Sequence, residues 1–187
     1  MKKVKVLLYC TKKAPYLVKD DFPLENEPIY FTHYKEVGSW GLPLNGKIVA
    51  ECEVETEEIR LWGDEIENYF GNNEEISIEK DSCLNFEQIE QYLCSNDYKG
   101  YALHISNLKI FDKPKRCQDD FLYERKIEPN FYNVEYFRKA PQNMMKVIDA
   151  YGDDEYILIS VRPEWLCKIL NGEKTIEVRK KVLKEML

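Results

Sequence analysis

The chain has 187 residues, of which 44% are hydrophobic and 13% aromatic, and its formal net charge is −7. This length and composition predict one globular domain with a hydrophobic core, and they exclude a disordered or fibrous chain. The negative net charge excludes a protein that coats nucleic acid through a general positive field.

The start of the chain and its cysteines allow predictions about the protein's cellular location and about disulfide and metal sites. No run of about 18 apolar residues occurs, and "MKKVKVLLYC" lacks the long apolar stretch and small-residue cleavage site of a signal peptide. We therefore expect a cytoplasmic protein that does not associate with a membrane. Six scattered cysteines form no C-x-x-C pair and have only two histidines beside them. Neither a disulfide scaffold nor a metal site is expected, and no cofactor is predicted.

Charge is unevenly distributed along the chain. Residues 51–90 hold fourteen acidic and two basic residues, so the rest of the chain is net positive. Two interpretations remain open: two solvated faces of opposite sign, or a basic site with an acidic flank. The acidic segment 51–81 is also a candidate surface for a basic protein partner.

The first half of the chain contains two expected strands. Residues 4–10, "VKVLLYC", form a short apolar run typical of a buried strand. Residues 12–43 show four prolines and no sustained period, which indicates a long connection. Residues 46–59 alternate, and this predicts a half-exposed strand with one face made of Ile48, Ala50, Cys52 and Val54.

The middle of the chain predicts one helix and one strand. Residues 60–82 are acidic and indicate a solvated excursion, whereas residues 85–97 have an Asn85 cap and apolar residues at helical spacing. Residues 100–111 alternate as a strand that we expect "DKP" to end. Residues 112–150, rich in tyrosine and phenylalanine, read as an irregular region.

The last part predicts strand, helix and strand. Residues 155–162 are strongly apolar, and the helix that follows has Pro163 near its first position and Gly172 just past its end. Residues 174–181 then alternate as a strand. Strands with irregular connections and few helices indicate an α+β fold, a small β-barrel with two to four short helices.

The segment "GEKTIEVR", residues 172–179, matches the G-x-K-x-x-E-x-R signature of the ASCH domain family, a branch of the PUA-like β-barrels. The lead-in "ILISVRPEWLCKILN" also resembles that family. The segments "YCTKK", "LNGKIVAECEV", "YALHISNLKIFDKPK" and "KAPQ" resemble later parts of longer bacterial and phage ASCH proteins. The resemblance therefore covers most of the chain.

The order of these segments differs from the family pattern. ASCH proteins usually begin with the strand, helix and signature unit, which here stands last, at 155–181. The chain therefore resembles a circularly permuted member, in which residues 3–10 would pair with the final strand, 175–181. The open alternatives are a dimer that exchanges its C-terminal unit, a boundary that cuts a tandem pair, and a mistaken order.

The final strand supplies the main candidate site. Alternation places Thr175, Glu177 and Arg179 on one face, because Ile176 and Val178 belong to the core. Lys174, at the preceding turn, is free to reach the same space. A surface row of ion pairs is the alternative interpretation.

Further candidates lie elsewhere. Ser160 and Arg162 precede a helix N-terminus, where backbone N–H groups favour an anion, although Glu164 in the first turn would compete. Tyr101 and His104 lie on one strand and should face opposite sides. Gln142 in "KAPQ" resembles a residue at a pocket edge in relatives. Three tryptophans are stacking candidates for which we favour packing: Trp40, Trp62 and Trp165.

The resemblance implies binding of RNA or a small modified nucleotide beside the signature strand. In that case Lys174, Arg179 and Arg162 would meet phosphate, Glu177 a base or sugar hydroxyl, and aromatic side chains an unpaired base. The alternative is a hydrolase, since some relatives are amidohydrolases in which a lysine activates a threonine three positions later. That position is Glu177 here, so Lys174 and Glu177 would act as an acid and base pair.

Overall fold

The computed structural model describes residues 2–11, 46–63, 65–68, 77–128, 131–136, 144–152 and 154–187. The predicted connection 12–43 lies outside these residues. The chain forms two compact units. Unit 1 comprises Met1–Val4, Glu53–Asn107 and Lys168–Leu187, and unit 2 comprises Lys5–Cys52 and Leu108–Cys167. Two long strands, β2 (Ile48–Trp62) and β4 (Lys99–Lys115), contribute residues to both.

Unit 2 is built on a mostly antiparallel sheet. Its strands follow the order β6 (Phe131–Tyr136), β5 (Phe121–Glu128), β7 (Met144–Asp149), β8 (Glu155–Val161) and β1 (Val4–Cys10). Only the β1 to β8 pairing is parallel among the described ladders, with Val6 opposite Ile157. One buried hydrophobic cluster of the unit comprises Leu7, Tyr9, Ile48, Cys117, Val147 and Leu158.

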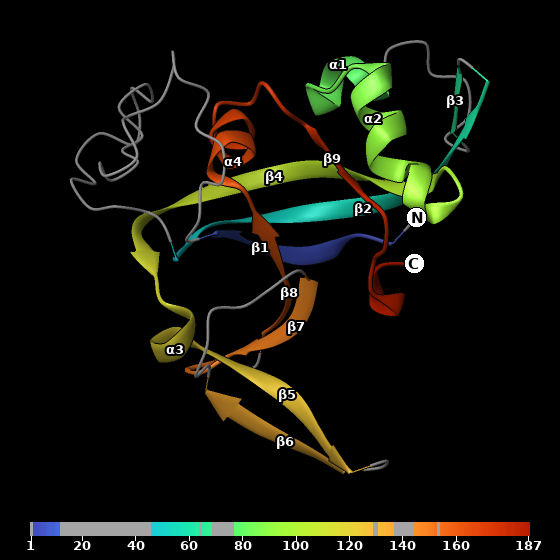
Figure 1. The fold of residues 1–187 in the computed structure, drawn as a ribbon. Helices are drawn as coiled ribbons and strands as arrows, with labels where there is room; N and C mark the ends of the chain where they lie inside the picture. Colours follow the sequence, from blue (N-terminus) through green and yellow to red (C-terminus); the bar gives the residue numbers. More distant parts are fainter. Residues whose placement is uncertain are drawn as a thin grey trace. The chain divides into compact units, whose positions relative to one another are not determined.

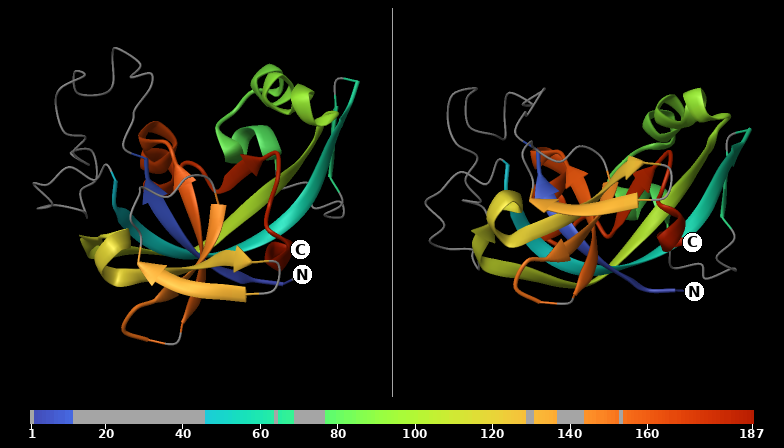
Figure 2. Two further views of the ribbon diagram at one scale, coloured as in Figure 1. Left: turned by 60° about the horizontal axis from the view of Figure 1, so that its bottom comes forward. Right: turned by 90° about the horizontal axis from the view of Figure 1, so that it is seen from below.

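The prediction that residues 112–150 are irregular is wrong. This region contains α3 (Cys117–Asp120) and the strands β5, β6 and β7, and Figure 2 shows β5 and β6 as a long antiparallel ribbon. Its tyrosines and phenylalanines are good strand residues, but the interspersed charges hide the period of two. The expected stop at "DKP" is also wrong, because β4 continues to Lys115. Pro114 stands one residue before that end, where its missing N–H costs little.

Unit 1 is a sheet with helices on one face. The strand order is β3 (Glu65–Asn68), β2, β4 and β9 (Ile176–Arg179), and two short helices, α1 (Ile78–Ser82) and α2 (Phe86–Leu93), pack on this sheet (Figure 1). Two 3-10 turns, η1 (Cys94–Asn96) and η2 (Lys184–Met186), complete the described elements. One buried hydrophobic cluster of the unit comprises Ile59, Leu61, Ile78, Ile89, Leu93, Ala102, Ile176 and Val178.

Both predicted helices are confirmed. Asn85 caps α2 by accepting a hydrogen bond from the Gln88 N–H, and the Gln88 side chain accepts from the Asn85 N–H in return. Helix α4 (Pro163–Leu170) begins at Pro163 and ends before Gly172, whose φ of 75° is left-handed. The helix divides between the units, so the strand, helix and strand segment 155–181 does not lie within one of them.

The predicted partner of the last strand is wrong. Strand β9 pairs antiparallel with β4, with Tyr101 opposite Arg179 and His104 opposite Ile176, while β1 lies between β8 and β2. The small Ala102 on β4 lets Ile176 and Val178 pack into the core of unit 1. The chain ends nevertheless meet: the Lys2 Nζ donates to the Glu185 carbonyl at 2.9 Å, and both ends lie side by side in the two views of Figure 2.

The predicted α+β class with short helices is confirmed. In the described part of the chain, the hydrogen-bonded strand order is open, from β6 at one end to β9 at the other, and does not close into a barrel. All six cysteines are free thiols. None of the described helices combines the length and apolar character needed to cross a membrane.

Candidate functional site

Buried polar groups single out one part of unit 1. Across the described residues, the buried polar or charged side chains are those of Glu57, Ser82, Ser160 and Lys174. Three of these four belong to unit 1. Lysine and glutamate are almost never fully buried unless they are paired, so their partners define the candidate site.

Lys174 is the most informative of them. It follows the turn at Gly172 and is 2% exposed. Its Nζ donates to the Ser82 carbonyl at the end of α1 at 2.6 Å and lies 3.3 Å from the Glu177 Oε2. Burial lowers the pKa of Lys174 below its ordinary value, and the nearby Glu177 carboxylate opposes this shift. Such a lysine is poorly solvated and held in place.

Glu177 links Lys174 to a second cation. Its Oε1 lies 3.0 Å from the Arg179 Nη2, so one carboxylate joins two basic side chains. The side chains of Glu177 and Arg179 are 14% and 20% exposed, whereas Ile176 and Val178 are buried. The predicted alternation along this strand is therefore confirmed. We call Lys174, Glu177 and Arg179 the β9 triad.

Two neighbours complete the surroundings of the β9 triad. Tyr101 on β4 is directly opposite Arg179, which places the two side chains on the same side of the sheet. Thr175 is exposed, and its backbone N–H donates to the Asp81 carbonyl. This backbone contact and the Lys174 to Ser82 bond tie the start of β9 to α1.

A second buried pair lies on the helix-covered side. The His104 Nε2 is 2.8 Å from the Glu57 Oε2, and the two side chains are 17% and 1% exposed. His104 stands opposite Ile176, a core residue, and so faces away from Tyr101, as predicted. The pair therefore lies beneath the helices, while Tyr101 and Arg179 point to the other side.

The sequence did not reveal Glu57. Its strand buries Cys52 and Val54 and then Glu57, Ile59 and Leu61, so the inward positions change from even to odd. The acidic run around it looks entirely solvated when read with one period of two. The sequence signal for a buried Glu57 was the change of the apolar residues from even positions to the odd positions Ile59 and Leu61.

The predicted site residues are divided between the two units. Lys174, Thr175, Glu177, Arg179, Tyr101 and His104 belong to unit 1, whereas Ser160 and Arg162 belong to unit 2, and Gln142 lies outside the described residues. In unit 2 the Arg162 carbonyl accepts the Leu166 N–H, as helix α4 begins. The competitor predicted there is present: Glu164 lies in the first turn of α4, and burial raises the pKa of its carboxyl group.

Tryptophan packing was predicted with mixed success. Trp62 at the end of β2 is 68% exposed, so the packed role expected for it is wrong. Trp165 on α4 is partly buried, and Trp40 lies outside the described residues.

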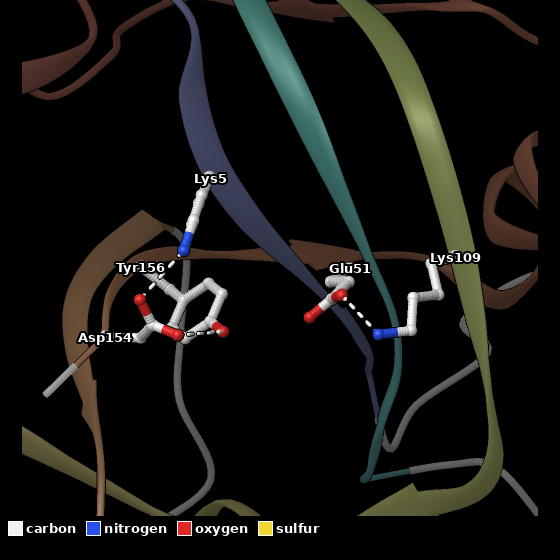
Figure 3. A network of polar contacts seen from close by, with 5 residues as sticks. All are labelled: Lys5, Glu51, Lys109, Asp154 and Tyr156. Atoms are coloured by element: carbon white, nitrogen blue, oxygen red, sulfur yellow. Dashed lines mark hydrogen bonds and ion pairs between the residues drawn. The ribbon is translucent and has the colours of Figure 1, made fainter. Parts of the chain in front are cut away.

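Unit 2 also carries a polar network on its sheet (Figure 3). The Lys5 Nζ on β1 lies 2.8 Å from the Asp154 Oδ1, and its Nζ is 5.7 Å from the centre of the Tyr156 ring. Beside it the Lys109 Nζ contacts the Glu51 Oε1 at 3.0 Å. These charges are mostly solvated, so they contribute little stability and give no reason to place a site there.

The acidic segment 51–81 is partly engaged within the chain. Glu51 contacts Lys109, Glu53 accepts from the Asn107 amide, and Glu57 contacts His104. In the described ranges, no group of three or more His, Cys, Asp or Glu residues is arranged to hold a metal ion.

Comparison of the chain with protein-family models, with curated proteins and with solved structures gives no match. The candidate site is thus defined by its own geometry: a buried lysine that fixes a carboxylate, an arginine bound to the same carboxylate, and a tyrosine opposite that arginine.

Proposed function

We propose that unit 1 binds a small nucleotide or a short stretch of RNA at the β9 triad. The observation that carries this proposal is the buried Lys174. Its ammonium holds the Glu177 carboxylate, and desolvation lowers the pKa of Lys174. Ionisable groups perturbed by burial together with a specific charged partner concentrate at functional sites. A surface row of ion pairs would leave such a lysine in water.

Each residue has a distinct role. Glu177 accepts hydrogen bonds from base N–H groups or a ribose hydroxyl, Arg179 meets phosphate or a base edge, and Tyr101 offers a ring for stacking. Lys174 is a positioning residue, because its Nζ is engaged by the Ser82 carbonyl and Glu177 inside the protein. This replaces the predicted role of Lys174 as a direct phosphate contact.

The sequence resemblance supports the same proposal. The triad residues occupy the lysine, glutamate and arginine positions of the ASCH signature in "GEKTIEVR". On this basis we propose that the chain is related to the ASCH proteins with its segments in a permuted order, and RNA or modified nucleosides are the ligand class that the resemblance implies.

The proposal is tested by calorimetric titration of the protein with nucleoside monophosphates and with short single-stranded RNA. Arg179→Gln and Glu177→Gln should weaken binding by about tenfold or more, because each removes a charge-assisted contact. Lys109→Gln is the matched control, since it breaks an exposed ion pair of unit 2. Equal affinity for all these variants, or no binding of any nucleotide, would refute the proposal.

A hydrolase is the second candidate, and one observation favours it. A lysine with a lowered pKa 3.3 Å from a carboxylate has the proximity that an acid and base pair needs. Thr175 is the adjacent hydroxyl but is not at the family's threonine position. Incubation with N4-acetylcytidine decides: water would add to the acyl carbon and release acetate and cytidine. An active wild type with an inactive, folded Lys174→Met would establish the enzyme, and no acetate release would exclude this reaction.

A further inference from the structure

Exposed aromatic side chains gather in unit 1 away from its core. Among the described residues, the exposed large hydrophobic residues are Trp62, Tyr92, Tyr98, Tyr151 and Leu187, and only Tyr151 of these belongs to unit 2. Trp62 is 68% and Tyr98 45% exposed. The Leu61 N–H donates to the Tyr98 carbonyl at 3.0 Å, which brings Trp62 and Tyr98 to the same end of β2 and β4.

The backbone at Tyr98 is strained. Asp97 and Tyr98 have φ angles of 52° and 57°, which lie in the left-handed region that residues other than glycine rarely adopt. The turn is nevertheless braced, because the Asn96 amide donates to the Lys99 carbonyl at 2.8 Å and to the Lys180 carbonyl at 3.0 Å. A bulky tyrosine is thus held partly exposed in a strained conformation, and strain of this kind concentrates at functional sites.

Basic side chains accompany these rings. The Lys180 Nζ lies 4.7 Å from the centre of the Tyr92 ring and donates to the Ser95 Oγ at 2.8 Å, so its ammonium is held in place. Lys180 directly follows Arg179 of the β9 triad, and Lys99 is exposed next to Tyr98. Acidic residues limit the patch: Asp97 lies in the turn, and Glu65 on β3 is opposite Trp62.

We propose that Trp62, Tyr98, Lys99 and Lys180 extend the nucleotide site into a track for single-stranded nucleic acid. This inference rests on the proposed function of the β9 triad and deepens it, because it adds the residues that would bind the further nucleotides of a strand. Bases stack on the exposed rings of Trp62 and Tyr98, while the ammonium groups of Lys99 and Lys180 neutralise phosphates. Stacking tolerates any base, so the track adds affinity with little sequence preference.

The test compares a single-stranded oligouridylate of about eight nucleotides, a length within the usual site sizes, with uridine monophosphate. Binding is measured by calorimetry on wild type, Trp62→Ala, Tyr98→Gly and Lys180→Gln. Trp62→Ala and Tyr98→Gly should each weaken oligonucleotide binding by about tenfold and leave monophosphate binding unchanged. Lys180→Gln should reduce the salt dependence of oligonucleotide binding.

Two controls distinguish a loss of oligonucleotide binding from unfolding and from the nonspecific loss of an exposed tyrosine. Tyr98→Gly removes the strained side chain, so its resistance to urea should equal or exceed that of wild type, and a loss of affinity then cannot be ascribed to unfolding. Tyr151→Ala truncates the 82% exposed tyrosine of unit 2 and should change nothing. Oligonucleotide binding no tighter than monophosphate binding, or unaffected by Trp62→Ala and Tyr98→Gly, would overturn the track but not the nucleotide site. Failure of both ligands to bind would overturn both.

Discussion

At the residue scale, the Lys174 ammonium makes two buried contacts, with the Ser82 carbonyl and with the Glu177 carboxylate. This group ties α1 to the start of β9 through Ser82 and fixes the Glu177 carboxylate, so it couples the fold of unit 1 to the geometry of the β9 triad. The sequence located this lysine through the signature but gave no indication that it is buried. Alternation does not fix the direction of a side chain at a turn, and the burial depends on α1, nearly a hundred residues earlier in the chain.

Lys174→Met should remove both contacts of the ammonium group and leave the site filled, because methionine has a similar volume and no charge. We expect a loss of about 1 to 3 kcal/mol in the free energy of unfolding, since the Ser82 carbonyl and Glu177 lose a buried partner. Nucleotide affinity should fall as well, because Glu177 is no longer held. Urea unfolding and calorimetric titration measure the two effects, and unchanged stability would contradict the buried role.

The same residue predicts a pH dependence. The folded-state pKa of Lys174 is lowered from 10.5, so the unfolded chain binds more protons between the two values, and stability from this residue rises with pH across that window. The free energy of unfolding of wild type relative to Lys174→Met should therefore increase as pH approaches 10.5. Other titrating groups contribute equally to wild type and to Lys174→Met, so their effects cancel in the difference between the two unfolding free energies. A difference that is constant or falls with pH would contradict the lowered pKa of Lys174.

The Glu57 and His104 pair calls for a double-mutant cycle. His104→Ala removes one partner of a buried carboxylate and should cost about 3 kcal/mol of unfolding free energy. Glu57→Gln keeps the shape and removes the charge, so it should cost less and should relieve part of the His104→Ala penalty in the double variant. Additive losses in urea unfolding would show that the 2.8 Å contact carries no energy.

At the element scale, local signals predicted the strands and helices whose ends are marked. Residues 4–10 became β1, the Asn85 cap became the start of α2, and Pro163 and Gly172 bracket α4. Strands β5 to β7 were missed because charges interrupt their alternation. The partner of β9 was predicted incorrectly because pairing depends on contacts distant in sequence, here between Ala102 and Val178.

Gly100→Ala tests the packing of β9 against β4 and α2. A Cβ at this position would lie 2.7 Å from the Leu93 Cδ2 and 3.0 Å from the Arg179 carbonyl oxygen. We expect a loss of about 1 to 3 kcal/mol in unfolding free energy and weaker nucleotide binding, because relief of the contact moves Arg179.

Gly152→Ala is the matched control for this substitution. The nearest atom to its added Cβ is 3.8 Å away, which is an ordinary contact. Its stability in urea should remain close to that of wild type. Equal stability of the Gly100→Ala protein would contradict the close approach of the three elements.

At the scale of the whole molecule, the sequence predicted the α+β class, and the chain forms two compact units that share β2 and β4. Length and composition cannot indicate such a division, since both units draw on segments from across the chain. Of the predicted site, six residues belong to unit 1 because β4 and β9 pair directly, while Ser160 and Arg162 belong to unit 2. Glu57 and the exposed Trp62 and Tyr98 emerged only from the structure.

The most direct test of the β9 triad as a nucleotide site is a two-dimensional amide NMR titration of the full chain with a nucleoside monophosphate. We predict saturable shift changes at residues 174–179 and at Tyr101, with residues 154–156 in the polar network of unit 2 unaffected. Saturable changes that spare residues 174–179, or no changes at millimolar nucleotide (about 4 kcal/mol of binding free energy), would contradict the account.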